Sequence, residues 1–342
     1  MSAGELPSSM PVCSLVEDKL YLGARDAAED EELLKGFEIT HILTVDIFPL
    51  KLASESSCKL MFLRADDVPE EDLLTHFENA CSFIQEGQNA GGCLVHCYFG
   101  VSRSATMVIG YIMKKYRLNC DEAFRKVKER RPCIGPNPGF MYQLRLYHIM
   151  EYQLNKSCLQ YRLYILEKLA TTAKRAGAFS AVPDELKSFW SIDDNASGER
   201  LKCRKCRMPL FPTSKILPHM QDESVPWWDS RWQDEPGEFC TSSFFVEPTR
   251  WLFDQANSLQ GKVLCPKCGS KVGNYNWAKV LCPKCGSKVG NYNWAGLYCE
   301  CGACVQPGFH ITPGRVDRTS SCSAPISPVP CTDAGQSDDS NS

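Results

Sequence analysis

The sequence has little net charge and no long hydrophobic run, and both absences narrow the possible functions. Its 38 lysine and arginine residues nearly balance 41 aspartate and glutamate residues, which leaves a formal net charge of -3. This balance removes the whole-chain electrostatic argument for binding DNA or an anionic membrane, so we predict neither partner. No apolar stretch approaches the roughly 18 residues of a membrane span, and no secretory signal pattern opens the chain. We therefore expect a cytoplasmic and nuclear protein.

Cysteine, in contrast, is abundant, with 20 in 342 residues. In a reducing compartment this count indicates metal ligands and reactive thiols rather than disulfides. The length exceeds the roughly 250–300 residues at which one hydrophobic core stops growing, so we expect more than one domain. We place an α/β domain at residues 14–154, a linker at 155–198, a cysteine-rich domain at 199–312 and a disordered tail at 313–342.

The first domain alternates β-rich runs with helical patterns. The β-rich runs are residues 20–23, 40–46, 59–66 and 93–97, and the helical patterns that follow are residues 104–116 and 121–131. This alternation predicts an α/β fold. The pattern at 104–116 is apolar almost all round, so we expect a buried helix. Within the proposed linker, residues 159–177 are compatible with a further helix.

The strongest motif, H-C-x-x-G-x-x-R-S, lies between the last strand and the buried helix. A thiol at a helix N-terminus, near backbone N–H groups and a guanidinium, favours its thiolate, so Cys97 is the predicted nucleophile. Arg103 can bind two phosphate oxygens at once, and Ser104 can donate a hydrogen bond to the sulfur as it leaves. His96 more plausibly orients the loop than acts as a base. The loop between nucleophile and arginine consists of Tyr98, Phe99, Gly100, Val101 and Ser102.

The spacing of this loop suits a phosphate group. The intervening residues can turn successive amides inward to form an anion-binding nest. Gly100 allows a close backbone approach and a positive φ. A serine, threonine or tyrosine leaving group also needs a proton, and Asp66 and Asp67 end the strand about thirty residues upstream. We choose Asp67 as the general acid, because strand alternation turns Asp66 to the opposite face.

These motifs resemble the dual-specificity protein phosphatases of the cysteine-dependent class, over residues 16–150. The resemblance implies a central mixed β-sheet flanked by helices, and hydrolysis of phosphotyrosine and phosphoserine or phosphothreonine without a metal for catalysis. It assigns Cys97 as nucleophile, Arg103 as phosphate ligand and Asp67 as acid, with Asn137 supporting the loop. Asn137 could equally be a helix cap before Pro138. Phosphatases of lipid, glycan or RNA phosphate share the loop and stay an open alternative.

The C-terminal cysteines predict zinc. Cys203 and Cys206 form a C-x-x-C pair, and we assign His219 and Cys240 as the other ligands of a closed, structural site. A second site has six candidate sulfurs, because the 17-residue segment at 262–278 recurs unchanged at 279–295. A perfect copy indicates recent tandem duplication or an error in the gene model.

The resemblance extends to relatives whose C-terminal domain binds two zinc ions. Their ligand spacing selects Cys282, Cys285, Cys299 and Cys301 for the second site and leaves the first copy's Cys265 and Cys268 as surplus. A ribbon of the two C-P-K-C pairs, which would free Cys299 and Cys301, stays open. The resemblance also implies phosphoprotein substrates. As an alternative main function, it implies a binding module that acts on pre-ribosomal particles in large-subunit maturation.

A basic cluster follows the buried helix. It allows two interpretations, a surface that steers phosphorylated substrates or a solvated helix face. Its members are Lys126, Lys128, Arg130 and Arg131.

Overall fold

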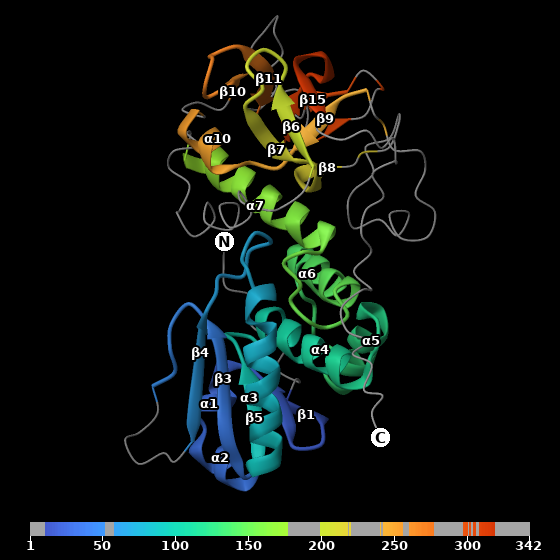
Figure 1. Cartoon of the computed structure of the whole chain (residues 1–342). Coiled ribbons are helices and arrows are strands. Elements are labelled where there is room, and N and C mark those ends of the chain that lie inside the picture. Colours follow the sequence, from blue (N-terminus) through green and yellow to red (C-terminus); the bar gives the residue numbers. More distant parts are fainter. Residues whose placement is uncertain are drawn as a thin grey trace, which may run out of the picture. The chain divides into compact units, whose positions relative to one another are not determined.

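The structure, a computed structural model, consists of two compact units, of which the first ends at Lys156 and the second starts at Ser157. Figure 1 shows the elements of both, and each unit is considered by itself. No helix in the described part of the chain is both long and apolar enough to cross a bilayer. The described residues are 11–51, 58–176, 199–217, 219, 240, 242–255, 260–276, 297–299, 301, 304–305 and 308–318.

The first unit is built on a five-stranded mixed sheet of order β1-β2-β5-β3-β4. Strand β1 is antiparallel to β2, and the four other strands are mutually parallel. The predicted mixed sheet is thus confirmed, and the four predicted β-rich runs form β2, β3, β4 and β5, whereas β1 is an additional strand. The strands are β1 (Cys13–Glu17), β2 (Leu20–Gly23), β3 (Ile39–Asp46), β4 (Lys59–Arg64) and β5 (Gly92–His96).

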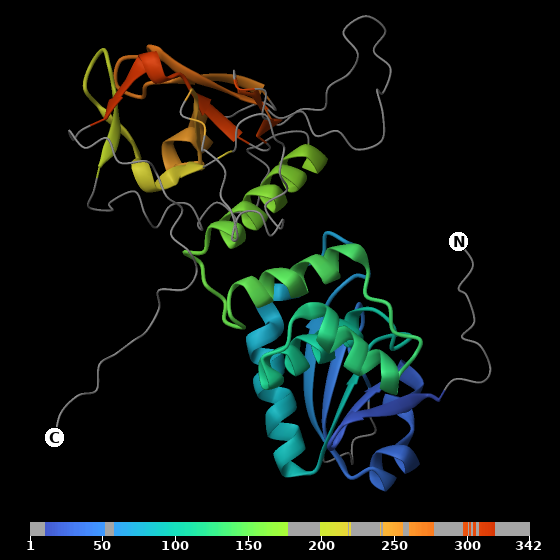
Figure 2. The ribbon, with the colours of Figure 1, turned by 90° about the vertical axis from the view of Figure 1, so that its right-hand side faces the viewer.

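Helices cover both faces of this sheet (Figure 2). On one face, Leu34 and its neighbours pack against Ile42 and Leu94. On the other face, α3 and α4 contact β3 and β5, while α5 and α6 pack against α4. Every residue of α4 from Arg103 to Met113 is buried, as predicted. The helices are α1 (Arg25–Glu29), α2 (Glu31–Gly36), α3 (Phe77–Ala90), α4 (Arg103–Tyr116), α5 (Cys120–Arg130) and α6 (Pro138–Ile149), with a 3-10 turn at Leu74–His76.

Side-chain caps fix where α5 and α6 begin. Asn119 and Glu122 form a capping box at α5, in which each side chain accepts a hydrogen bond from the other residue's backbone N–H. At α6, Asn137 Oδ1 accepts from the Phe140 N–H at 3.0 Å, and Pro138 occupies the first helical position. Both caps satisfy amides that a helix start otherwise leaves unpaired. The segment between these helices is thereby held in a defined path beside the cysteine loop.

The second unit combines one long helix with small sheets. Their strand orders are β10-β11-β14-β9-β8, β15-β6-β7 and β12-β13. The helices are α7 (Leu159–Ala176) and α10 (Arg250–Gln255). The strands are β6 (Arg200–Cys203), β7 (Pro209–Pro212), β8 (Ile216–Leu217), β9 (Phe244–Val246), β10 (Gln260–Leu264), β11 (Lys271–Asn276), β12 (Leu297–Tyr298), β13 (Cys304–Val305), β14 (Gly308–Ile311) and β15 (Val316–Arg318), with 3-10 turns at Thr213–Lys215 and Pro313–Arg315.

The structure corrects two of the expected domain boundaries. Helix α7 lies within the predicted linker 155–198 and belongs to the second unit. Strand β15 lies within the predicted tail 313–342 and pairs with β6. The linker residues 177–198 and the tail residues 319–342 lie outside the described residues. Both errors have one cause, because the contacts that attach each element to the second unit join residues far apart in the chain and leave no local signal.

A buried ion cluster ties α7 to the rest of the second unit. Arg162 of α7 donates to the Glu247 carboxylate at 2.5 Å and to the Ser214 carbonyl at 2.9 Å. Lys215 Nζ lies 3.7 Å from the same carboxylate. Only 1% of Glu247 is exposed, and its burial raises the pKa of the carboxyl. Removing a partner from a buried ion pair costs about 3–5 kcal/mol, so α7 is integral to this unit.

We therefore expect a fragment of residues 157–318 to unfold cooperatively, and a fragment of residues 199–318 to lose that transition or to show a much lower Tm. The shorter fragment lacks Arg162 and the buried apolar side chains of α7, of which Ile165, Leu166 and Leu169 each contribute roughly 1.5–3 kcal/mol when fully buried. Thermal unfolding in equal zinc measures this. Equal Tm values for the two fragments would show that α7 is a linker after all.

Candidate functional site

The loop between β5 and α4 places Cys97 at the centre of a buried site. Only 1% of Cys97 is exposed. Its Sγ accepts hydrogen bonds from the Gly100 N–H at 3.3 Å and from Ser104 Oγ at 3.1 Å. Donors placed in this way can stabilise negative charge on the sulfur when it acts as nucleophile and leaving group. The predicted contact of Ser104 with the sulfur is present in the structure.

Gly100 has the backbone conformation that the motif predicted. Its φ is +68°, in the left-handed region that side chains rarely adopt. A Cβ at this position would lie 2.4 Å from the carbonyl oxygen of Gly23, at the end of β2. Any larger residue would therefore push the loop away from the sheet. The glycine is required both by its own conformation and by this close approach.

Arg103 is held by a carboxylate that the sequence analysis did not single out. Arg103 Nη1 donates to Asp46 Oδ1 at 2.6 Å and to the Ala65 carbonyl at 3.2 Å. Asp46 is the buried last residue of β3, and its position at the end of an apolar parallel strand was an available signal. The Nε of Arg103 is also buried and has no hydrogen-bond partner among the described residues. This orphaned donor can be satisfied by an oxygen of a bound phosphate.

A small polar network connects Asp67 to the cysteine loop. Its Oδ1 accepts from Ser102 Oγ at 2.7 Å and from Asn137 Nδ2 at 2.9 Å. Its Oδ2 lies 3.9 Å from Arg103 Nε. Asp66 instead makes its backbone contact with Glu71, away from this network. The structure thus brings Asp67, and not Asp66, to the cysteine loop.

Asn137 has both of the properties that the sequence left open. Its side-chain NH₂ donates to Asp67, while its Oδ1 caps α6. Its backbone N–H also donates to Ser102 Oγ at 3.2 Å. One residue therefore links the helix cap, the carboxylate and the phosphate loop.

His96 lies beneath the loop and is fully buried. Its Nε2 is 2.8 Å from Thr44 Oγ1, and its Nδ1 is 3.4 Å from the Cys97 carbonyl oxygen. Burial lowers the pKa of His96 to about 4. The ring is neutral at physiological pH, and both nitrogens are engaged, which fits an orienting role and not that of a base.

A cavity of about 590 Å³ adjoins the loop at Arg103. Large aromatic side chains are exposed on it, with 69% of Phe48 and 53% of Tyr98 accessible. Aromatic walls and basic residues beside an anion site suit a phosphorylated side chain. The lining consists of Arg25, Asp46, Ile47, Phe48, Pro49, Lys51, Tyr98 and Arg103.

Comparison with known proteins identifies the family. The family described as "Dual specificity phosphatase, catalytic domain" matches residues 20–150. Over 337 residues the chain is 32% identical to dual specificity protein phosphatase 12 of Mus musculus, and the alignment covers 92% of each. The chain belongs to the dual specificity protein phosphatase family. The expected resemblance is confirmed, and this phosphatase is accordingly an enzyme that removes phosphate from phosphoproteins.

Two further relatives show different extents of similarity to the phosphatase. It is 31% identical to tyrosine-protein phosphatase yvh1 of Schizosaccharomyces pombe over 79% of both chains, so that alignment reaches beyond the catalytic domain. Among solved structures, human DUSP28 is 34% identical with a TM-score of 0.40. That match covers 43% of this chain and 97% of DUSP28.

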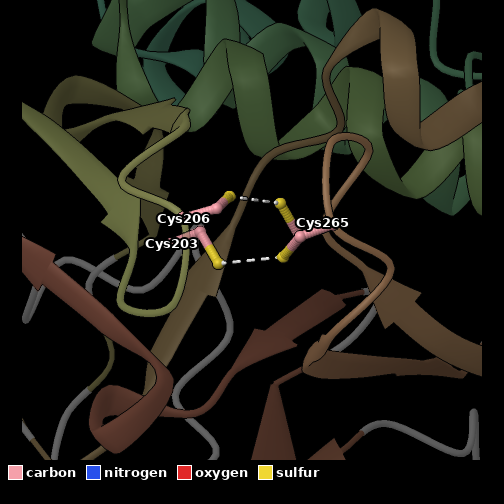
Figure 3. A group of neighbouring side chains, drawn as sticks. Cys203, Cys206 and Cys265 are labelled. Carbon is pink, nitrogen blue, oxygen red and sulfur yellow. Dashed lines mark hydrogen bonds between the residues drawn. The ribbon is translucent and has the colours of Figure 1, made fainter.

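The second unit of the phosphatase contains two groups of potential metal ligands. Within each group the ligand atoms all lie within 4.8 Å of one another, as four ligands of a tetrahedral ion would. The distance between Cys206 Sγ and Cys265 Sγ is 3.5 Å, and Cys203 Sγ lies 3.8 Å from Cys268 Sγ (Figure 3). The first group is Cys203, Cys206, Cys265 and Cys268, and the second is His219, Cys240, Cys299 and Cys301.

The predicted grouping of these ligands was wrong. Cys203 and Cys206 meet the first C-P-K-C pair and not His219 and Cys240, which instead meet Cys299 and Cys301. The predicted ligands Cys282 and Cys285 lie outside the described residues. The error arose because we paired ligands that are neighbours in sequence. In the fold, each group joins ligands from distant parts of the chain, such as Cys203 with Cys268 and Cys240 with Cys299, which spacing alone does not reveal.

Two observations test whether these groups suit a metal. His219 Nε2 is buried and has no hydrogen-bond partner among the described residues, which leaves its lone pair or proton site free for an ion. In the first group, the hydrogen bond from Ser270 lowers the pKa of Cys268 to about 6. Metal ligation requires deprotonated thiols, so a thiol with a lowered pKa is a suitable ligand. Four cysteine or histidine ligands also leave no open coordination position for a substrate.

Proposed function

We propose that this phosphatase hydrolyses phosphotyrosine and phosphoserine or phosphothreonine through a phosphocysteine intermediate on Cys97. The grouping of three functions at one loop carries the proposal: Gly100 and Ser104 donate to the buried Cys97 sulfur. The Arg103 guanidinium ends the same loop, and the Asp67 carboxylate lies 3.9 Å from its Nε. A nucleophile, a phosphate ligand and an acid are the groups that such a transfer needs. The family favours protein substrates over lipid, glycan or RNA phosphates.

In the first step, the Cys97 thiolate attacks phosphorus and the bond from phosphorus to the substrate oxygen breaks. Protonated Asp67 gives its proton to that leaving oxygen, while Arg103 binds oxygens of the transferred group. In the second step, the Asp67 carboxylate takes a proton from water as the water oxygen attacks phosphorus. The sulfur–phosphorus bond breaks, phosphate leaves, and the Ser104 hydroxyl stabilises the returning thiolate. Apart from the substrate and water, both proposed steps use only groups of the protein.

Replacing the nucleophile tests the first step. Cys97→Ser should abolish turnover of an aryl phosphate, because a serine hydroxyl in this loop is not ionised at neutral pH. Steady-state kinetics measures the turnover, and elemental analysis should show unchanged zinc content, since Cys97 belongs to neither ligand group. Cys81→Ser is a suitable matched control, because that thiol is buried in α3 and its pKa is raised to about 12. Retained turnover in Cys97→Ser would refute the assignment.

Replacing the acid tests proton transfer. Asp67→Asn keeps an oxygen for the Ser102 and Asn137 hydrogen bonds but has no proton to transfer, so kcat on a phosphoserine peptide should fall about 10²–10⁴-fold. The loss should be smaller on p-nitrophenyl phosphate, whose leaving group needs little protonation. Asp66→Asn, one residue away, should change neither rate. An equal loss on both substrates would argue that Asp67 has another role.

We further propose that both ligand groups of the second unit bind structural zinc. Thiolate and imidazole ligands in closed groups of four suit zinc better than harder cations. Each such ion contributes about 10–16 kcal/mol of apparent folding free energy in small zinc domains. The ions would hold together sheets of only two to five strands.

Paired substitutions separate the two copies of the repeat. Cys265→Ser with Cys268→Ser should remove one zinc per chain and destabilise the second unit, because these thiols complete the first ligand group. Cys282→Ser with Cys285→Ser, the identical change in the second copy, should leave the zinc content unchanged. Native mass spectrometry counts the ions. The opposite result would restore Cys282 and Cys285 as ligands.

Two expectations from the sequence stay predictions. One is a role of the second unit in binding pre-ribosomal particles, which rests on the resemblance alone. The other is the cytoplasmic and nuclear location. Neither is needed for the proposed reaction.

A further inference from the structure

The phosphate loop is oriented by donors that lie outside it. From Tyr98 to Val101, every backbone carbonyl is taken by a partner on its outer side. Two of the donors are backbone amides: the Arg25 N–H donates to the Tyr98 carbonyl at 3.1 Å, and the Gly135 N–H donates to the Val101 carbonyl at 2.9 Å. The other two belong to the Arg131 side chain. Its Nη2 donates to the Phe99 carbonyl at 3.4 Å, and its Nε donates to the Gly100 carbonyl at 3.0 Å.

Holding the carbonyls outward determines where the amides point. In a trans peptide the C=O and the next N–H point in opposite directions, so each captured carbonyl turns the following amide toward the inside of the loop. The Gly100 N–H, which follows the captured Phe99 carbonyl, does point at Cys97 Sγ. Inward amides are the donors that bind a phosphate and stabilise charge in its transfer.

Arg131 supplies two of these four contacts from a fully buried position. Only 1% of the residue is exposed, which contradicts the expectation of a solvated or substrate-steering basic cluster for this member. Its Nη1 donates to the Pro11 carbonyl at 2.9 Å and to Ser14 Oγ at 3.3 Å. Among the described residues, no carboxylate lies within ion-pair distance of its guanidinium. Within the described part of the chain, the hydrogen-bond partners of this buried positive charge are three backbone carbonyls and the Ser14 hydroxyl.

We propose that Arg131 is a positioning residue of the phosphatase. It holds the Phe99 and Gly100 carbonyls outward, so that the amides that follow them meet the phosphate, and its buried positive charge favours anions in the loop. The inference rests on the proposed function, because it concerns the same loop. The alternative is that Arg131 has a structural role only, because the same side chain also binds Pro11 and Ser14 near the start of the described chain.

Three variants of the full chain separate these roles. Arg131→Met removes all four hydrogen bonds of the Arg131 side chain, two to the loop carbonyls and two to Pro11 and Ser14. Arg131→Lys keeps the charge but not the planar guanidinium that reaches two carbonyls. Ser14→Ala is the matched control, because it removes one contact of Arg131 that does not involve the loop. Each variant is measured for kcat and KM on p-nitrophenyl phosphate, for inhibition by orthovanadate, and for the pH dependence of Cys97 alkylation by iodoacetamide.

We expect Arg131→Met to lower kcat/KM at least roughly tenfold, by analogy with the larger loss when an oxyanion donor is removed outright. Orthovanadate should bind correspondingly more weakly, and the midpoint pH of alkylation should rise. Arg131→Lys should recover the alkylation midpoint, through its charge, more fully than it recovers kcat. Ser14→Ala should stay within about twofold of the wild type.

The inference would be overturned if a folded Arg131→Met variant had the kinetics, orthovanadate inhibition and alkylation profile of the wild type. It would also be overturned if Ser14→Ala changed these measurements as much as Arg131→Met does. If the methionine variant does not fold, Arg131→Gln, which can reach one of the two carbonyls, takes its place under the same criteria. Cys97→Ser is measured in parallel. Turnover in that variant contradicts the proposed function, whereas an inactive Cys97→Ser beside an unimpaired Arg131 variant contradicts only the role of Arg131.

Discussion

The phosphate site depends on one constraint, the direction in which the backbone of the loop after Cys97 points. Five residues between nucleophile and arginine can wrap an anion only if their amides face inward, which requires that their carbonyls find donors elsewhere. The structure supplies those donors from the start of α1 and from the segment after α5. The register of β2 against β5 aligns Gly23 with His96, which brings the sheet within contact of Gly100. The fold thus fixes the loop from two sides.

The charged groups of the site are arranged so that a bound phosphate would complete their hydrogen bonds. Asp46 binds one end of the Arg103 guanidinium and Asp67 lies 3.9 Å from Nε, which has no hydrogen-bond partner within the described part of the chain. A buried donor without a partner is costly, and a phosphate oxygen removes that cost. The same carboxylate that fixes Arg103 in place also limits the net positive charge of the site. Asp46 thus offsets part of the positive charge that Arg103 brings to the loop.

Features local in sequence could be predicted, and those made by distant contacts could not. The roles of Cys97, Gly100 and Ser104 follow from spacing within one loop, and the structure places these residues accordingly. Arg131 carries no such signal, because in sequence it is one of several basic residues and only tertiary packing buries it. Likewise, the C-x-x-C turns identify ligands without showing which turns meet. Helix α7 was misjudged as linker because the buried partner of Arg162, Glu247, is 85 residues away.

The two units are consequently stabilised in different ways. The catalytic unit encloses a mixed, mostly parallel sheet between helices, so continuous apolar packing can hold its loop rigid. The second unit divides its strands among small sheets, and each ligand group draws its members from turns far apart in the chain. Cys203 is the last residue of β6 and Cys206 lies between β6 and β7 of one sheet, whereas Cys265 and Cys268 lie between β10 and β11 of another. An ion at this group would join two sheets that pair no strands with each other in the described part of the chain, so metal ligation would add a link there that strand pairing does not supply.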